Sequence, residues 1–228
     1  MKFLEYTPLS SLNSFLHHIN VGDYVVEGDI QAYSCKLAGV DKKLSRSLDQ
    51  EVVSTLSTTP PSLLSSSPVG PLSESQSRKT LIYLILTLNH MYPDYDFSML
   101  RAHHFRKDEN VNMAKANIEQ LLLETGKVWN QEEPGQNFLD VLWQSVDEVM
   151  DLKDCDVYSY NADMEGDPFA EVGQVWAFNH FFYNKKLKRI LYFSCRSKLA
   201  RQENDSDSDV GEQDEVPDET FADDMDLN

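Results

Sequence analysis

Two apolar runs near the end of the chain form its most regular pattern. Val175–Tyr183 and Leu187–Cys195 are rich in aromatic and β-branched residues, and the polar link between them contains Asn184, Lys185 and Lys186. Such runs favour strands, and Asn tolerates the positive φ of a tight turn. A helix that is apolar all round is the weaker alternative, because Asn184 and the basic residues after it interrupt the run. The segment therefore predicts a β-hairpin.

Alternate residues of the first run would face opposite sides of this hairpin. Both sets are apolar, with Val175, Ala177, Phe181 and Tyr183 on one side and Trp176, Phe178 and Phe182 on the other. Both faces of the hairpin therefore have to be covered. We predict a central sheet with helices on both faces, and a core that includes Trp176, Phe178, Phe181 and Phe182.

Apolar residues recur at helical spacing in five stretches, which we predict as helices. They run from Thr7 to before Gly22, from Asp41 to Leu56, and over Thr80–Met91, Asn117–Asn130 and Asn137–Asp151. Thr7 is predicted to cap the first helix and Pro8 to fit its first turn. The remaining segments suggest extended structure over Tyr24–Lys36, with Gly28 at a bulge or break, a compact loop or strand over Tyr92–Phe105, and a strand over Asp154–Tyr160. Strands and helices are mixed without regular alternation, which predicts the α+β class with a mainly antiparallel sheet.

Composition divides the chain further. Residues 57–77 are dense in Ser and Pro and contain little that can be buried, so we predict a disordered linker there. Residues 1–56 and 78–201 would then form one globular domain, since a loop inserted into a domain costs little closure entropy. Residues 202–228 hold 12 acidic residues and no Lys or Arg. We predict a disordered acidic tail, which is too poor in apolar residues to fold by itself.

Charge narrows the possible functions. The formal net charge is −18, of which the tail contributes 12 negative charges, so the rest of the chain carries −6. An acidic protein lacks the basic footprint that nucleic-acid binders need, and it is repelled by anionic membranes.

Cys35, Cys155 and Cys195 are odd in number and far apart, which suggests buried thiols of a cytosolic or nuclear protein. Met1–Tyr6 leads straight into the first helix without a signal peptide, and the longest apolar run, Leu81–Leu86, is too short to span a bilayer.

No catalytic or cofactor signature is present, and we expect neither an enzyme nor a bound cofactor or metal. His103 and His104 lie near Asp94 and Asp96, but adjacent histidines diverge, which makes a shared metal unfavourable. Asp94 and Asp96 would share one side of an extended segment, as paired catalytic acids do, yet they are better explained as caps of backbone amides after a helix. His180 fits a core histidine with satisfied hydrogen bonds better than an acid/base catalyst.

Two features suggest regulation. Lys185, Lys186, Lys188 and Arg189 form a basic cluster, which is either a nuclear localisation signal or an ordinary solvated turn. Phosphorylation is predicted at Ser45, which follows two lysines, at Ser67, which precedes a proline, and at Ser75 in the same Ser-rich segment.

Three blocks resemble one known family, the repressors of RNA polymerase III transcription. They are Met1–Leu44, above all AYSCKLAGVDKKL; SRKTLIYLILTLNHMYPDYDFS at Ser77–Ser98; and DCDVYSYN through DPF to WAFNHFFYNKKLKRILYFSCR, within Asp154–Arg196. The resemblance covers almost all of Met1–Arg196, and MKFLEYTPL and LTLNHMYPDYDFS are similar to the plant branch.

The resemblance implies a regulator without enzymatic activity. Such proteins bind RNA polymerase III near its clamp and initiation subunits, so that initiation factor IIIB cannot engage it and synthesis of transfer RNA and 5S RNA falls. Kinases of the TOR and PKA types and opposing phosphatases would move the protein between cytoplasm and nucleus. We expect a monomer whose candidate polymerase contacts are Asp94, Tyr95, Asp96, Lys185, Lys186, Lys188 and Arg189.

Two other functions remain open from the residues alone. One is an enzyme centred on Asp94, Asp96 and His103, which no further motif supports. The other is an adaptor whose acidic tail binds basic partners without touching the polymerase. The tail itself has three possible roles: it solvates the chain, it lies in the basic cleft where the polymerase holds DNA, or it folds back over Lys185–Arg189.

Overall fold

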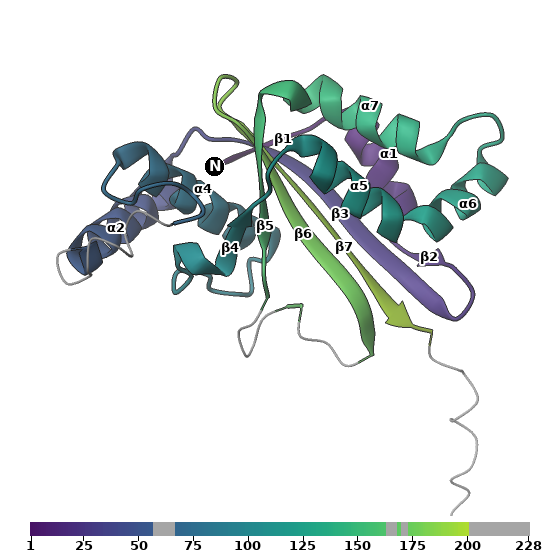
Figure 1. Cartoon of the computed structure of the whole chain (residues 1–228), viewed down its shortest axis with the longest axis horizontal. Coiled ribbons are helices and arrows are strands. Elements are labelled where there is room, and N and C mark those ends of the chain that lie inside the picture. The colour runs from purple at the N-terminus through teal and green to yellow at the C-terminus, as the bar shows by residue number, and fades with distance from the viewer. Residues whose placement is uncertain (57–66, 163–167, 170–172, 201–228) are drawn as a thin grey trace, which may run out of the picture.

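A seven-stranded antiparallel sheet forms the centre of the computed structural model (Figure 1), which describes residues 1–56, 67–162, 168–169 and 173–200. The strand order is β1-β3-β7-β6-β5-β4, and β2 also pairs with β3. The strands are β1 (Lys2–Leu4), β2 (Ile19–Asn20), β3 (Tyr24–Ser34), β4 (Phe105–Lys107), β5 (Cys155–Tyr160), β6 (Gln174–Asn184) and β7 (Arg189–Leu199).

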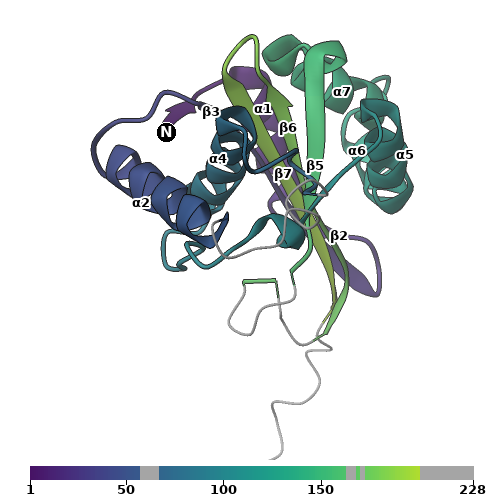
Figure 2. The ribbon, with the colours of Figure 1, turned by 60° about the vertical axis from the view of Figure 1, so that its left-hand side comes forward.

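Helices cover both faces of this sheet (Figure 2). The helices are α1 (Thr7–Leu16), α2 (Gly39–Leu56), α4 (Ser75–Met91), α5 (Val111–Leu121), α6 (Leu123–Glu132) and α7 (Phe138–Met150). Helices α1, α5, α6 and α7 bury one core against the sheet, and α4, with α2 packed on it, buries a second core against the other face. The predicted α+β class, with a mainly antiparallel sheet covered on both faces, is therefore confirmed. Among the described helices, none has the length and apolar character needed to cross a membrane.

The predicted hairpin is the centre of the sheet. Strands β6 and β7 pair from Asn184 with Arg189 to Gln174 with Lys198, so each strand is longer than its apolar run. Phe178 and Phe182 are buried toward α1 and α7, whereas Phe181 is buried toward α4. Trp176 is only half-buried, because it lies beside a register shift near the start of β6.

Gly28 does not mark a bulge or break. β3 runs without interruption, and its residues from Tyr24 to Ser34 pair one by one with β7. A Cβ atom at Gly28 would lie 3.0 Å from Cys195 Sγ and 3.4 Å from Leu16 Cβ. The glycine therefore permits the close approach of α1 to the sheet, a long-range contact with no local signal.

The N-terminal region differs from the prediction. Lys2–Leu4 does not lead straight into a helix but forms the edge strand β1, paired with β3. The first helix ends at Leu16, and Ile19–Asn20 adds a further short strand. Pro8 lies in the first turn as predicted, but Tyr6 is the N-cap residue and no side chain caps the helix. Strands this short depend on partners elsewhere in the chain, so local pattern does not reveal them.

Two helices in the middle of the chain have boundaries that differ from the predicted ones. The helix predicted over Asn117–Asn130 is two helices, α5 and α6, which are separated at Leu122. Helix α4 begins at Ser75, inside the segment predicted as a linker, and Val69 is buried in the core beside α4. Residues 57–66 and the tail, residues 202–228, lie outside the described residues, so their predicted disorder stays a prediction.

Candidate interaction surfaces

The turn between β6 and β7 is fixed by a buried asparagine. The side chain of Asn184 is fully buried; its Nδ2 donates to the carbonyl of Met150 at 2.8 Å, and its Oδ1 accepts from the amide of Leu187 at 2.9 Å. Asn184 itself has no positive φ; instead Lys188 has a φ of 54°. The turn is therefore built differently from the sequence-based prediction, because Asn184 acts through its amide and not through its backbone.

The predicted basic cluster surrounds this turn, and its members have different partners. Lys185 pairs with Asp156 at 2.7 Å and Lys186 with Asp154 at 2.7 Å. Arg189 donates to the carbonyl of Val149 at 2.8 Å, whereas Lys188 is exposed and forms no ion pair with a described residue. The cluster is thus held in a folded turn at the end of the sheet.

The carboxylate of Asp156 pairs with two lysines at this end of the sheet, Lys107 at 2.8 Å and Lys185 at 2.7 Å. Burial acts to raise its pKa, but hydrogen bonds and charge from Lys107 and Lys185 outweigh that effect and lower the pKa below its usual value. Asp156 is therefore a stable anion that balances part of the positive charge at the turn.

A cavity of about 900 Å³ lies beside the turn. We call it the basic groove. Five of its lining side chains are cationic: Lys36, Lys79, Lys185, Lys188 and Arg189. No Asp or Glu of the described residues lines it, and its apolar lining includes Leu4, Leu187 and the rings of Tyr83 and Tyr183. Lys36 and Lys79 were missed from the sequence, because the chain brings them to Lys185–Arg189 only through the pairing of β3 with β7 and the packing of α4.

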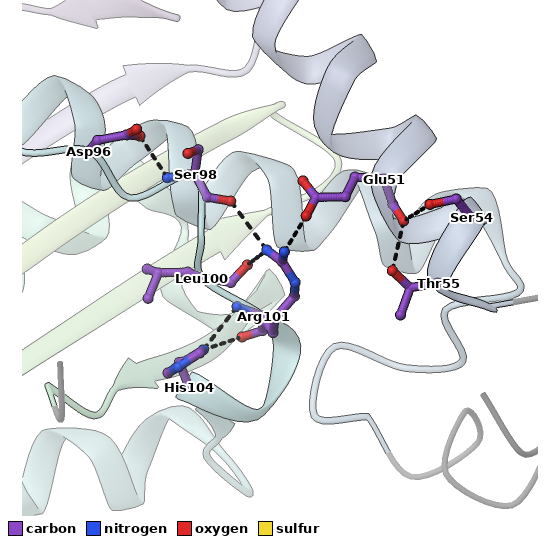
Figure 3. A network of polar contacts seen from close by, with 8 residues as sticks. All are labelled: Glu51, Ser54, Thr55, Asp96, Ser98, Leu100, Arg101 and His104. Atoms are coloured by element: carbon purple, nitrogen blue, oxygen red, sulfur yellow. Dashed lines mark hydrogen bonds and ion pairs between the residues drawn. The ribbon is translucent and has the colours of Figure 1, made fainter. Parts of the chain in front are cut away.

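The second candidate set, Asp94, Tyr95 and Asp96, lies in the loop after α4, and all three side chains are exposed. Asp96 Oδ1 accepts from the amide of Ser98 at 2.9 Å, which agrees with a role in capping a turn (Figure 3). The ring of Tyr95 is 42% exposed and rests against the rings of Tyr92 and Phe97.

Arg101 holds the rest of this loop in place (Figure 3). Its guanidinium donates to the carbonyls of Ser98 at 3.2 Å and Leu100 at 3.0 Å, and it also pairs with Glu51 of α2. The ring of His104 accepts from the amide of Arg101 at 2.9 Å. Arg101 therefore ties the later part of the loop to α2, while the amide of Tyr95 donates to the carbonyl of Tyr92 at 3.0 Å.

The structure does not bring the two candidate sets together. The first half of α4 lines the basic groove through Lys79 and Tyr83, whereas Asp94–Asp96 follow its other end. From Tyr83 to Met91, α4 rises roughly 12 Å along the helix axis. The acidic loop and the basic turn are therefore separate surfaces.

The predicted phosphorylation sites lie in different environments. Ser45 is half-buried within α2, and Ser75 is exposed at the first residue of α4. Ser67 is also half-buried, and its hydroxyl has no hydrogen-bond partner in the described part of the chain.

His180 is buried, but it is not the satisfied core histidine that we predicted. Neither ring nitrogen forms a hydrogen bond within the described residues, and Nε2 lies 3.6 Å from Asp108 Oδ2. Burial lowers the pKa of the imidazole, although the charge of Asp108 acts against this. The ring packs against that of Phe178, with the two centroids 5.6 Å apart.

No set of three His, Cys, Asp or Glu side chains within the described ranges is placed to hold a metal ion. The rings of His103 and His104 lie side by side, with their centroids 4.1 Å apart. Cys35, Cys155 and Cys195 are free thiols, and Cys35 and Cys195 are buried.

Comparison with known proteins identifies the family. A family model described as Maf1 regulator matches residues 26–194. A protein of Dictyostelium discoideum named "Repressor of RNA polymerase III transcription" is 37% identical, over 98% of this chain and 94% of that protein. Its counterpart in Schizosaccharomyces pombe is 34% identical, over 91% and 90% of the two chains. Two crystal structures of citrus MAF1 are 41% identical and cover 85% of this chain and all of theirs, with TM-scores of 0.69 and 0.71. The resemblance seen in the three sequence blocks is confirmed, and this chain belongs to the Maf1 family of repressors of RNA polymerase III transcription.

Proposed function

We propose that this chain represses transcription by RNA polymerase III. In this proposal it binds the polymerase near its clamp and initiation subunits as a monomer, blocks the engagement of initiation factor IIIB, and so lowers the synthesis of transfer RNA and 5S RNA. The observation that carries the proposal is its 37% identity, over 98% of its length, to a protein named as such a repressor. The shared fold supports it, since citrus MAF1 aligns over 85% of the chain.

The loop of Asp94, Tyr95 and Asp96 is the polymerase contact that we favour. An exposed aromatic ring on a fixed backbone binds a partner at a low cost in conformational entropy, and aromatic residues are frequent hot spots of interfaces. The carboxylates beside Tyr95 suit a basic partner surface. The turn of Lys185, Lys186, Lys188 and Arg189 is a second, separate contact in this proposal.

We expect the combined replacement Asp94→Asn, Tyr95→Ala and Asp96→Asn to weaken binding to purified RNA polymerase III at least tenfold. The ring and both charges would be lost. The side-chain oxygen at position 96 would still accept from the amide of Ser98. The melting temperature should therefore fall only slightly, through the lost contacts of the Tyr95 ring with Tyr92 and Phe97. The affinity of each variant is measured on surface-immobilised polymerase. Repression is measured as the decrease in transcription of a transfer RNA gene in vitro.

The matched control is Tyr24→Ala, since the ring of Tyr24 is 38% exposed but lies at the start of β3. Full binding by the triple variant would exclude this loop as the contact. If the unaltered chain neither bound the polymerase nor repressed transcription, the repressor function itself would be wrong. The alternative of an acidic-tailed adaptor that binds other basic partners would then be favoured.

Phosphorylation at Ser45, Ser67 and Ser75 is proposed to relieve repression and to shift the protein from nucleus to cytoplasm. A phosphate adds about −1.5 to −2 charges. At Ser75 it would lie at the N-terminus of α4, where negative charge is stabilised. At Ser45 it would lie close to Lys42 and Lys43 and neutralise their charge.

Replacing Ser45, Ser67 and Ser75 with Glu is expected to reduce the nuclear fraction of the protein and its repression of transfer RNA synthesis in cells. The variant with Ala at the same three positions should keep its nuclear fraction and its repression of transfer RNA synthesis during growth. Ser47→Glu is the control, because Ser47 is an exposed residue of the same helix as Ser45. Equal localisation and repression in the Glu and Ala variants would contradict control at these sites.

A further inference from the structure

The basic groove contains positive charge that the described residues do not balance. Lys185 is paired with Asp156, and Arg189 donates to a backbone carbonyl. Lys36, Lys79 and Lys188 are exposed, line the same cavity and form no ion pair within the part of the chain that the structure describes. Like charges placed together around one cavity repel each other, so binding of an anionic group there is favourable.

The groove is more than a charged surface. Leu4, Leu187, Tyr83 and Tyr183 contribute apolar area to its lining, and Leu187 is 43% exposed. A ligand that uses the whole groove therefore combines several carboxylates with apolar side chains. An acidic peptide has this chemistry, whereas an inorganic anion would leave the apolar lining in contact with water.

The tail of this chain has that composition. Its 12 acidic residues are not opposed by any Lys or Arg, and Phe221, Met225 and Leu227 lie among acids near its end. The negative charge of the tail thus matches the lysines of the groove, and its apolar residues match the apolar lining.

The tail is also long enough to reach the groove. It follows β7, whose 11 residues place Leu199 roughly 35 Å from the turn. The 27 residues of 202–228 span roughly 90 Å when fully extended and about 30 Å on average as a flexible chain. Because the tail is tethered, its effective concentration at the groove is on the order of millimolar, so even a weak contact is populated.

We propose that residues 202–228 fold back and occupy the basic groove of the same chain. The tail then shields Lys36, Lys79 and Lys188 and excludes other acidic segments from the groove until it is released. The contact is electrostatic in large part and weakens as added salt screens the charges. It goes beyond the proposed repression, and the tail would have to leave the groove before Lys185, Lys188 and Arg189 could contact the polymerase.

Carbodiimide cross-linking of the full chain tests this contact, since the reagent joins a lysine amine to a carboxylate only when the two are in contact. We expect cross-links from Asp and Glu of 202–228 to Lys36, Lys79 and Lys188 at about 0.05 M salt. At about 1 M salt, where the screening length falls to about 3 Å, they should decrease at least fivefold. Mass spectrometry of the digested protein identifies the joined residues.

Two charge-reversal variants provide the comparison. Lys79→Glu with Lys188→Glu should reduce the cross-links that remain possible at Lys36 and Lys185 at least threefold, because the groove loses its attraction for the tail. Lys127→Glu with Lys153→Glu changes the net charge equally at exposed positions outside the groove and should leave those cross-links unchanged. Melting temperatures confirm that both variants are folded.

Other results would overturn the proposal. Cross-links spread evenly over Lys36, Lys127 and Lys153 would mean that the tail is only solvated. In a mixture of ¹⁴N- and ¹⁵N-labelled chains, cross-links of mixed isotope composition would mean that a second copy supplies the tail. Polymerase binding is measured separately, so absent cross-links with intact binding would refute this contact alone and leave the proposed function standing.

Discussion

The variant Phe182→Ala is expected to lower the free energy of unfolding by about 3–5 kcal/mol. Phe182 lies on β6 in the centre of the sheet, is fully buried, and has its ring 6.2 Å from that of Trp143 on α7. Truncation removes the ring from the core and leaves a cavity that the surrounding strands and helix cannot close. Urea unfolding followed by circular dichroism measures the loss, as a lower midpoint with an unchanged slope.

Val175→Ala is the matched control, because Val175 lies on the same strand but its side chain is 50% exposed. Its effect should stay within about 0.5 kcal/mol. The loss in free energy of unfolding for Trp176→Ala should lie between those of Phe182→Ala and Val175→Ala, since the Trp176 ring is half-buried. A loss for Phe182→Ala as small as that for Val175→Ala would show that the ring does not belong to the core.

The second large effect is expected for Asn184→Ala, which should cost about 2–4 kcal/mol, because each buried polar group left without a hydrogen bond costs about 1–3 kcal/mol. The substitution removes a buried hydrogen bond to the carbonyl of Met150 and a part-buried one from the amide of Leu187. Thermal unfolding gives the loss, and hydrogen exchange at Leu187 should become faster because its amide is no longer bonded.

Asn112→Ala at an exposed position of α5 controls for the loss of an asparagine as such. Lys188→Gly provides a second comparison, because glycine adopts the φ of 54° at that position without strain. It should leave stability unchanged or slightly higher. If Asn184→Ala melted at the same temperature as Asn112→Ala, the side-chain amide would not be the anchor of the turn.

Local sequence pattern was sufficient for the elements that are long and periodic. The hairpin of β6 and β7 was predicted from two apolar runs, and the opposite directions of Phe181 and Phe182 followed from strand geometry alone. Helix α7 begins and ends within one residue of the predicted Asn137–Asp151. In these segments every residue contributes to the same repeat, so the signal accumulates along the chain.

Elements that depend on distant partners were not predictable in this way. β1, β2 and β4 have two or three residues each, and they are strands only because β3 and β5 offer them free edges. Local pattern at Gly28 suggests a bulge or break, because the contact of this glycine with Leu16 and Cys195 is invisible in the sequence. The half-burial of Trp176 likewise depends on a local shift in pairing that its neighbours do not encode.

The amino-acid sequence by itself determined the family, through long and unusual runs, and the class of fold, through periods that follow from backbone geometry. Only the tertiary structure decided how charged residues are grouped. Lys36 and Lys79 join Lys185–Arg189 in one groove, whereas Asp94–Asp96 are kept apart from it by the second half of α4. The physical reason is that strand pairing and helix packing act between residues far apart in the chain, and the position of a surface charge follows from that packing and not from its neighbours in sequence.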